Sequence, residues 1–67
     1  MKDLSNPEIA RLIDSWIHSE RDRMILKRRL CDGIRFETLS AEFDLSVRQI
    51  KKIVYKSTDI LSKHMKL

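Results

Sequence analysis

The feature that most constrains the fold is the apolar pattern between residues 46 and 61. Apolar or small residues recur there at spacings of three and four, at Val47, Ile50, Ile53, Val54, Ser57, Ile60 and Leu61. This spacing follows the 3.6-residue turn of an α-helix and places these side chains on one inward face. Ser46 precedes the pattern and Gln49 follows three residues later, which predicts a capping box. We therefore expect a capped helix over about residues 46–64.

Three shorter helices are predicted before it. Asn6 as a cap and Pro7 as the first helical residue predict a helix over about 7–18. Its inward stripe is Ile9, Leu12, Ile13, Trp16 and Ile17, which places Trp16 in the core. Ser19 is expected to cap a helix over about 20–31, which buries Ile25, Leu26, Leu30 and, less clearly, Met24. Phe36, Leu39, Ser40 and Phe43 share one face of a helix over about 36–43.

The connections between these helices also follow from the sequence. Gly33 is the single glycine of the chain, and a left-handed residue at the end of the second helix explains it. One glycine and one proline in 67 residues are too few for the tight turns of a small sheet protein. The chain is therefore predicted to be a single all-α domain of four helices, spanning residues 1–67.

Cellular context is predicted from what the sequence lacks. Cys31 is the only cysteine, so no disulfide can form within the chain, and we expect a partly buried thiol in a reducing cytoplasm. No apolar run approaches the roughly 18 residues of a membrane span. The first residues do not have the apolar stretch of a signal peptide. A cytoplasmic protein without membrane attachment is expected.

The positive charge of the chain is concentrated in one segment. The sequence has 14 basic and 10 acidic residues, a formal net charge of +4. Residues 46–58 contain Arg48, Lys51, Lys52 and Lys56 and no acidic residue, so their charge equals the net excess of the whole chain. Such segregation is typical of a surface that binds a polyanion. On charge alone, a solvated basic helix face is an equally good interpretation.

The last two predicted helices form a helix-turn-helix. A short helix, a turn at residues 44–46 and a second helix with a basic outer face match that motif. The small Ser40 is expected where the two helices approach, and Leu45 is expected to fill the turn. An α-helix fits the major groove of B-DNA, and its N-terminal residues reach the base edges. The positions expected to face outward are Val47, which also belongs to the inward stripe, and Arg48, Gln49, Lys51, Lys52, Tyr55 and Lys56.

The segment 33-GIRFETLSAEFDLSVRQIKKI-53 resembles the region 4 helix-turn-helix of bacterial sigma factors and of related phage and Gram-positive regulators. The family pattern, Gly-Leu-Thr-hydrophobic-Glu-Glu-Ile-Ala-x-x-Leu-Gly-Leu-Ser, aligns without a gap. Asp44 replaces the usual turn glycine, Ser40 an alanine and Arg35 a capping threonine. The resemblance implies a small transcription regulator of bacterial or phage origin that binds double-stranded DNA. The chain carries none of the other sigma regions, so promoter-directed transcription by this chain alone is not expected.

Individual roles follow from the position of each side chain. Arg48 lies in the first turn, where its guanidinium can bond guanine in two places or contact a phosphate. Gln49 can pair with adenine or serve as the capping partner of Ser46. Lys51 and Lys52 lie one turn further along. Phosphate contacts are expected for Tyr55 and Lys56, although Tyr55 can instead be half-buried. The candidates for positioning the DNA backbone are Arg35, Thr38 and Ser46.

Other classes of function are not expected. The sequence has no glycine-rich phosphate loop, no metal-spaced cluster and no nucleophile with a plausible base, so we expect no enzyme, cofactor, metal or small-molecule substrate. Sigma region 4 also docks on RNA polymerase, so a protein-interaction module with weak DNA contact is the alternative hypothesis. A homodimer is a further candidate, through the first helix or the apolar end of the fourth, where Met65 and Leu67 follow Ile60 and Leu61. Arg28 and Arg29 can contact phosphates or solubilise the domain, and we favour the second role.

Overall fold

The computed structural model describes residues 6–64, and this part of the chain is helical without a β-strand. Its elements are α1 (Asn6–Trp16), α2 (Glu20–Leu26), a π-helix η1 (Lys27–Cys31), α3 (Phe36–Phe43) and α4 (Val47–Ser62). Because η1 continues α2 without a break, the predicted all-α domain of four helices is confirmed. No described helix has the length and apolar character needed to cross a membrane.

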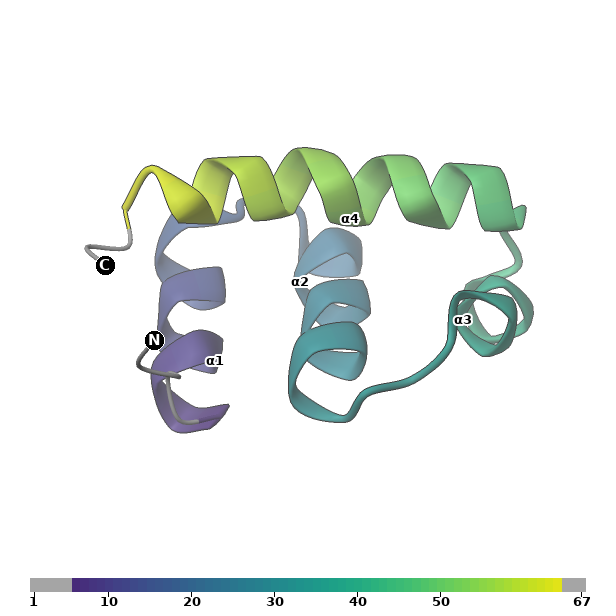
Figure 1. Ribbon diagram of the computed structural model, residues 1–67, viewed down its shortest axis with the longest axis horizontal. Coiled ribbons are helices and arrows are strands. Elements are labelled where there is room, and N and C mark those ends of the chain that lie inside the picture. The colour runs from purple at the N-terminus through teal and green to yellow at the C-terminus, as the bar shows by residue number, and fades with distance from the viewer. Residues whose placement is uncertain (1–5, 65–67) are drawn as a thin grey trace.

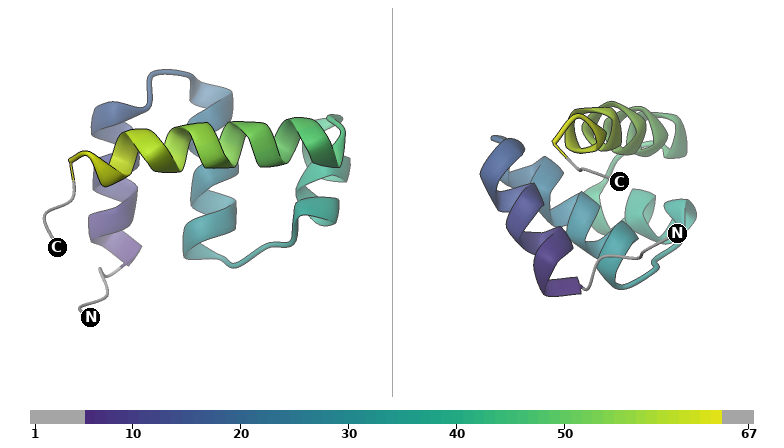
Figure 2. Two further views of the ribbon diagram at one scale, coloured as in Figure 1. Left: turned by 45° about the horizontal axis from the view of Figure 1, so that its top comes forward. Right: turned by 60° about the vertical axis from the view of Figure 1, so that its left-hand side comes forward.

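The helix α4 spans the length of the domain and the other helices lie on one side of it. In Figure 1, α4 runs across the ends of α1 and α2, and α3 lies beneath its N-terminal end. The right-hand view of Figure 2 looks obliquely along α4 and shows α1, α2 and α3 all on the same side. The opposite side of α4 is therefore covered by no other helix of residues 6–64.

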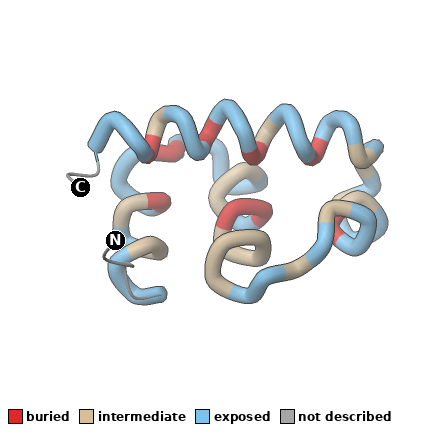
Figure 3. The backbone as a smooth tube through the Cα atoms, in the orientation of Figure 1, coloured by how far each residue is buried: buried red, intermediate tan, exposed pale blue. Residues whose placement is uncertain are grey.

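Each α-helix contributes apolar side chains to a single core. The buried residues are Ile13, Ile17, Ile25, Leu26, Leu39, Ile50, Val54 and Leu61. On α4 the buried positions recur along the side that faces the other helices (Figure 3). Full burial of one such side chain contributes about 1.5–3 kcal/mol, so this face fixes the rotation of α4 about its axis.

The link between α1 and α2 is held by side chains that bond to backbone groups. Ser19 caps α2, because its hydroxyl accepts a hydrogen bond from the Asp22 amide at 3.3 Å. From α2, Arg23 donates to the carbonyls of Ile17 at 2.9 Å and His18 at 3.2 Å. These bonds satisfy carbonyls at the C-terminal end of α1. The cap at Ser19 is confirmed, and α1 ends at Trp16, earlier than the predicted residue 18.

The π-helix η1 is a departure from the regular helix predicted over residues 20–31. The Asp32 amide donates to the Lys27 carbonyl, five residues back, at 3.3 Å. Side chains tie η1 to α1: Lys27 pairs with Asp14 at 2.8 Å, and the Asn6 amide donates to the Cys31 carbonyl at 3.3 Å. Asn6 is thus the first helical residue of α1 and contacts η1, whereas the sequence predicts it as a cap.

Gly33 follows η1 and turns the chain toward α3. Its φ of 69° lies in the left-handed region, as predicted. A Cβ atom built at this position would meet no atom within 4 Å. The requirement for glycine therefore comes from the backbone conformation and not from crowding.

Two residues predicted to face the core are exposed. The ring of Trp16 stacks on that of His64 with the centroids 3.5 Å apart, and 42% of the Trp16 residue surface remains exposed. Trp16 follows the correct helical spacing, but it is the last residue of α1 and its ring packs on His64, which follows the end of α4. Met24 is 53% exposed on the outer side of α2. Met65 and Leu67 lie outside the described residues.

Candidate nucleic-acid interface

The turn between α3 and α4 sets the direction of the candidate interface. Asp44 adopts the left-handed conformation, with φ 54° and ψ 45°. The Leu45 amide donates to the Ser40 carbonyl at 3.0 Å, and the Ser40 hydroxyl donates to the Leu45 carbonyl. Leu45 is half-buried and packs against the core. Ser40 therefore lies at the close approach predicted for it and fastens the turn through two hydrogen bonds.

The capping box at the start of α4 is present. The Ser46 hydroxyl accepts from the Gln49 amide at 3.1 Å, and the Gln49 side-chain oxygen accepts from the Ser46 amide at 2.9 Å. The same oxygen also accepts from the Ser46 hydroxyl at 3.2 Å. The predicted cap is confirmed, and in this state the Gln49 side-chain oxygen is occupied by the helix terminus. Pairing with adenine would require Gln49 to leave the cap or to use its amide nitrogen.

The outer face of α4 carries the predicted contact residues on one helix side. The exposed residues there are Arg48, Gln49, Lys51, Lys52, Tyr55 and Lys56, and we call this set the basic face. Val47, which is also predicted to face outward, is half-buried at the start of the helix and is not part of this exposed set. Tyr55 is 61% exposed, so its predicted alternative as a half-buried residue is wrong.

The lysine and arginine side chains of the basic face have no acidic partner within the described residues. Within residues 6–64, none of the side chains of Arg48, Lys51, Lys52 and Lys56 makes an ion pair or a hydrogen bond, whereas Lys27, Arg28 and Lys63 pair with acids. Lys63, for example, reaches Asp59 at 3.7 Å. The positive charge of this face is therefore not neutralised within the described fold.

An aromatic cluster supports one flank of the basic face. Phe36 begins α3, and its ring meets the Tyr55 ring edge-on with 6.2 Å between the centroids. The Lys51 ammonium lies 5.8 Å from the Phe36 centroid, and the Arg29 guanidinium lies 4.2 Å from it. Arg29 also donates to the Ile34 carbonyl at 3.0 Å. Phe36 thereby links η1 and α3 to the outer side of α4 through cation–π and ring contacts.

Arg28 and Arg29 have structural partners that the sequence reading did not foresee. Arg28 binds both carboxylate oxygens of Glu42 on α3 and also pairs with Asp32 at 3.2 Å. Hydrogen bonding from Arg28 lowers the pKa of the Glu42 carboxyl, and the same bond raises the pKa of Arg28. The prediction that Arg28 and Arg29 serve mainly to solubilise the domain is therefore incomplete, because both side chains also connect η1 to α3.

Arg35 and Thr38 lie on the α3 side of the interface. Arg35 precedes α3 with an extended backbone, at φ −69° and ψ 154°, and its side chain does not cap the helix. Both residues are exposed, and Arg35 is adjacent in sequence to Phe36 of the aromatic cluster. Arg35 is thus an exposed residue at the start of α3, and Thr38 is exposed on α3 itself.

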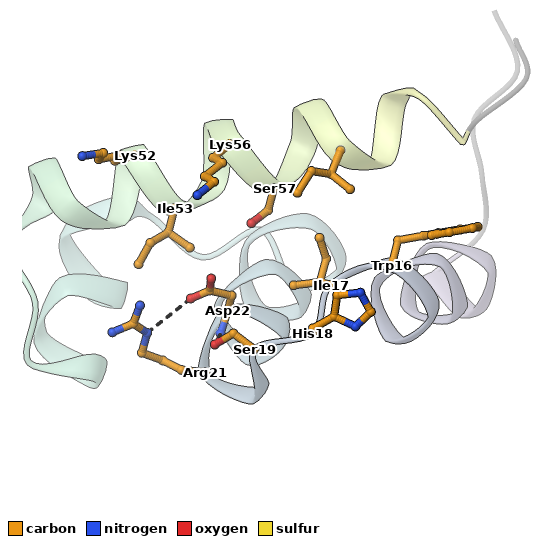
Figure 4. A pocket seen from close by; sticks show the side chains of 11 residues that line it. Trp16, Ile17, His18, Ser19, Arg21, Asp22, Lys52, Ile53, Lys56 and Ser57 are labelled. Carbon is orange, nitrogen blue, oxygen red and sulfur yellow. Dashed lines mark hydrogen bonds and ion pairs between the residues drawn. The ribbon is translucent and has the colours of Figure 1, made fainter.

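The other flank of the basic face borders a groove. The groove has a volume of about 340 Å³ and lies between α4 and the segment from Trp16 to Asp22. Figure 4 shows Lys52, Ile53, Lys56 and Ser57 of α4 on one side of it. Sequence periodicity could not reveal the groove or the Phe36 cluster, because both arise from contacts between helices.

The described residues contain no group of three or more His, Cys, Asp or Glu side chains that could hold a metal ion. Cys31 is half-buried, with its sulfur 3.8 Å from the Asn6 carbonyl oxygen. Comparison of the chain with protein-family models, with curated proteins and with solved structures finds no significant match.

Proposed function

We propose that the chain binds double-stranded DNA in a sequence-specific manner, with the N-terminal half of α4 in the major groove. The observation that carries this proposal is the basic face, whose cations have no acidic partner within residues 6–64. Because no acid within the described residues neutralises this charge, it is available for phosphates. The resemblance to sigma region 4 supports the same interpretation, with the domain acting as a small transcription regulator.

The arrangement of the side chains supports a division of roles. Arg48 and Lys52 are four residues apart and share the outermost line of α4, where base edges would be reached. Arg35, Lys51 and Tyr55 lie toward α3, where phosphate contacts would fix the register of the helix. One domain of this size offers few contacts, so high specificity would require paired half-sites or a larger assembly.

The proposal is tested with the double variant Arg48→Ala/Lys52→Ala and the matched control Arg11→Ala/Lys63→Ala. Both variants lose two exposed cations, but the control residues lie on α1 and beyond the end of α4. Binding to a labelled random duplex is followed by fluorescence anisotropy between about 50 and 200 mM salt, the range over which phosphate contacts weaken strongly. Circular dichroism checks that both variants keep the fold.

For the unmodified chain, the log of affinity is expected to fall with log salt at a slope of about −4 to −5. The Arg48→Ala/Lys52→Ala variant should lose most of its DNA affinity, and its salt slope should become less negative by about one for each lost phosphate contact. The control variant should keep nearly the affinity and salt slope of the unmodified chain. Equal binding by the two variants would show that this face does not contact DNA. Absence of binding by the unmodified chain at low salt would instead favour the protein-interaction alternative, with RNA polymerase as the candidate partner.

A further inference from the structure

The groove beside α4 has an apolar floor that DNA binding does not use. Ile17 is buried at its base, and Ile53 and Ile60 of α4 line it while half-buried. Trp16 lies at one end of the groove and is 42% exposed (Figure 4). The phosphates and sugars of a duplex are polar and would leave this apolar surface uncovered. An exposed tryptophan beside aliphatic residues is typical of a surface that receives an apolar group from a protein partner.

The rim of the groove carries a net positive charge. Arg21 and Asp22 pair with each other at 3.2 Å, so their formal charges cancel. Lys52 and Lys56 line the groove from α4, with Lys56 pointing toward it (Figure 4), and neither makes an ion pair within the described residues. A partner that fills the groove must therefore present negative charge beside its apolar group.

We propose that this groove binds a short acidic segment of a partner protein, with one bulky apolar side chain on the floor and carboxylates beside Lys52 and Lys56. Most of the lining residues are exposed, so a small molecule would leave much of its surface in water, whereas a peptide covers the length of the groove. If the proposed DNA binding holds, this occupant competes with DNA, because Lys52 belongs to both surfaces.

Trp16 provides a direct readout, because it is the only tryptophan in the chain. The probe is a peptide in which Leu-Phe is flanked on each side by three acidic residues. The control peptide has the same sequence with Gln and Asn in place of the acidic residues. The acidic peptide is expected to shift Trp16 emission to shorter wavelength with saturation, and the neutral peptide is expected to have little effect. Equal shifts from both peptides, or no shift with either, would overturn the proposal.

Matched variants locate the site. Arg21→Glu places an acid on the groove wall, and Arg11→Glu makes the same change of charge on α1 outside the groove. Peptide affinity is expected to fall about 5-fold or more in Arg21→Glu, in line with the upper range for exposed charge pairs, and to change little in Arg11→Glu. Equal losses of peptide affinity in both variants would show that the peptide is held by nonspecific electrostatic attraction, and would refute the groove as its site. An equal emission shift from inorganic phosphate alone would identify a small-anion site and refute a peptide site.

The two proposals can fail separately. Arg35 lies on the α3 side of the basic face and does not line the groove. The Arg35→Ala variant should therefore weaken DNA binding and leave the peptide titration unchanged. Peptide binding without DNA binding would refute the proposed function alone. DNA binding without a peptide response would refute the groove alone. A Trp16 signal that depends on protein concentration without peptide would show that a second copy of the chain occupies the groove, which would also refute this inference.

Discussion

Replacing Ser46 by alanine tests whether the capping box stabilises the start of α4. The substitution removes the hydroxyl that accepts from the Gln49 amide at 3.1 Å, and it also removes the hydroxyl contact to the Gln49 side chain at 3.2 Å. Because Ser46 is exposed, water can replace part of what is lost. Loss of an N-cap serine typically costs about 1 kcal/mol. For a domain of 60–100 residues, this corresponds to a fall of about 4–8 °C in Tm.

Thermal unfolding followed by circular dichroism measures the effect. Ser15→Ala is the matched control, because Ser15 is an exposed serine inside α1 and caps no helix. Its Tm should be unchanged or slightly higher, since alanine has the better helix propensity. Gln49→Ala removes the reciprocal bond of 2.9 Å, and the double variant should cost less than the sum of the two single changes. Additive losses would show that the two bonds do not act as a unit.

Ser46→Asp separates the structural role of the cap from DNA binding. Aspartate is as good an N-cap as serine, so the Tm of this variant should stay close to that of the unmodified chain. The added negative charge lies next to the basic face and should weaken binding to a random duplex. An unchanged Tm in Ser46→Ala, or the same Tm change in Ser15→Ala, would refute the reasoning about the cap.

Three further predictions concern the support of the basic face. Leu39→Ala empties a fully buried position between the helices and should cost about 2–5 kcal/mol in urea unfolding; a loss below 1 kcal/mol would contradict the packing described. Asp44→Ile places a β-branched residue at φ 54° and should lower Tm, whereas Asp44→Gly should not; equal effects would argue against the left-handed turn. Arg28 lowers the pKa of Glu42, so the stability from this pair is present above about pH 4.5 and lost as pH falls further. The stability difference between the unmodified chain and Glu42→Gln should therefore shrink on acidification, and a constant difference would contradict this.

The parts of the fold that depend on neighbouring residues were predictable from the sequence. The cap at Ser46 and the inward stripe of α4 each follow from residue types at fixed short spacings. Gly33 followed in the same way, because its conformation is set by the end of a helix. These features also determine which side of α4 faces outward, so the residues of the basic face could be predicted in advance, although the prediction also includes Val47, which is half-buried.

The parts that depend on contacts between helices were not predictable in the same way. Trp16 has the correct helical phase for the core, but the sequence does not show that its ring stacks on His64 from the other end of the chain and stays 42% exposed. The π-helix η1 has no local signal, and it is tied to α1 by the pair between Lys27 and Asp14. The bracing by Arg28 and the cluster around Phe36 join residues from separate elements, which periodicity cannot place relative to each other.

The most direct test of the central claim is a titration of the labelled protein with random duplex DNA, followed by amide chemical shifts at low and high salt. We expect shifts concentrated between residues 46 and 56, with smaller ones near Arg35, all weakened by salt as counterion release requires. Amides on the outer side of α1 should not move. Shifts spread evenly over the domain, or no shifts at low salt, would contradict the assignment of DNA binding to this face.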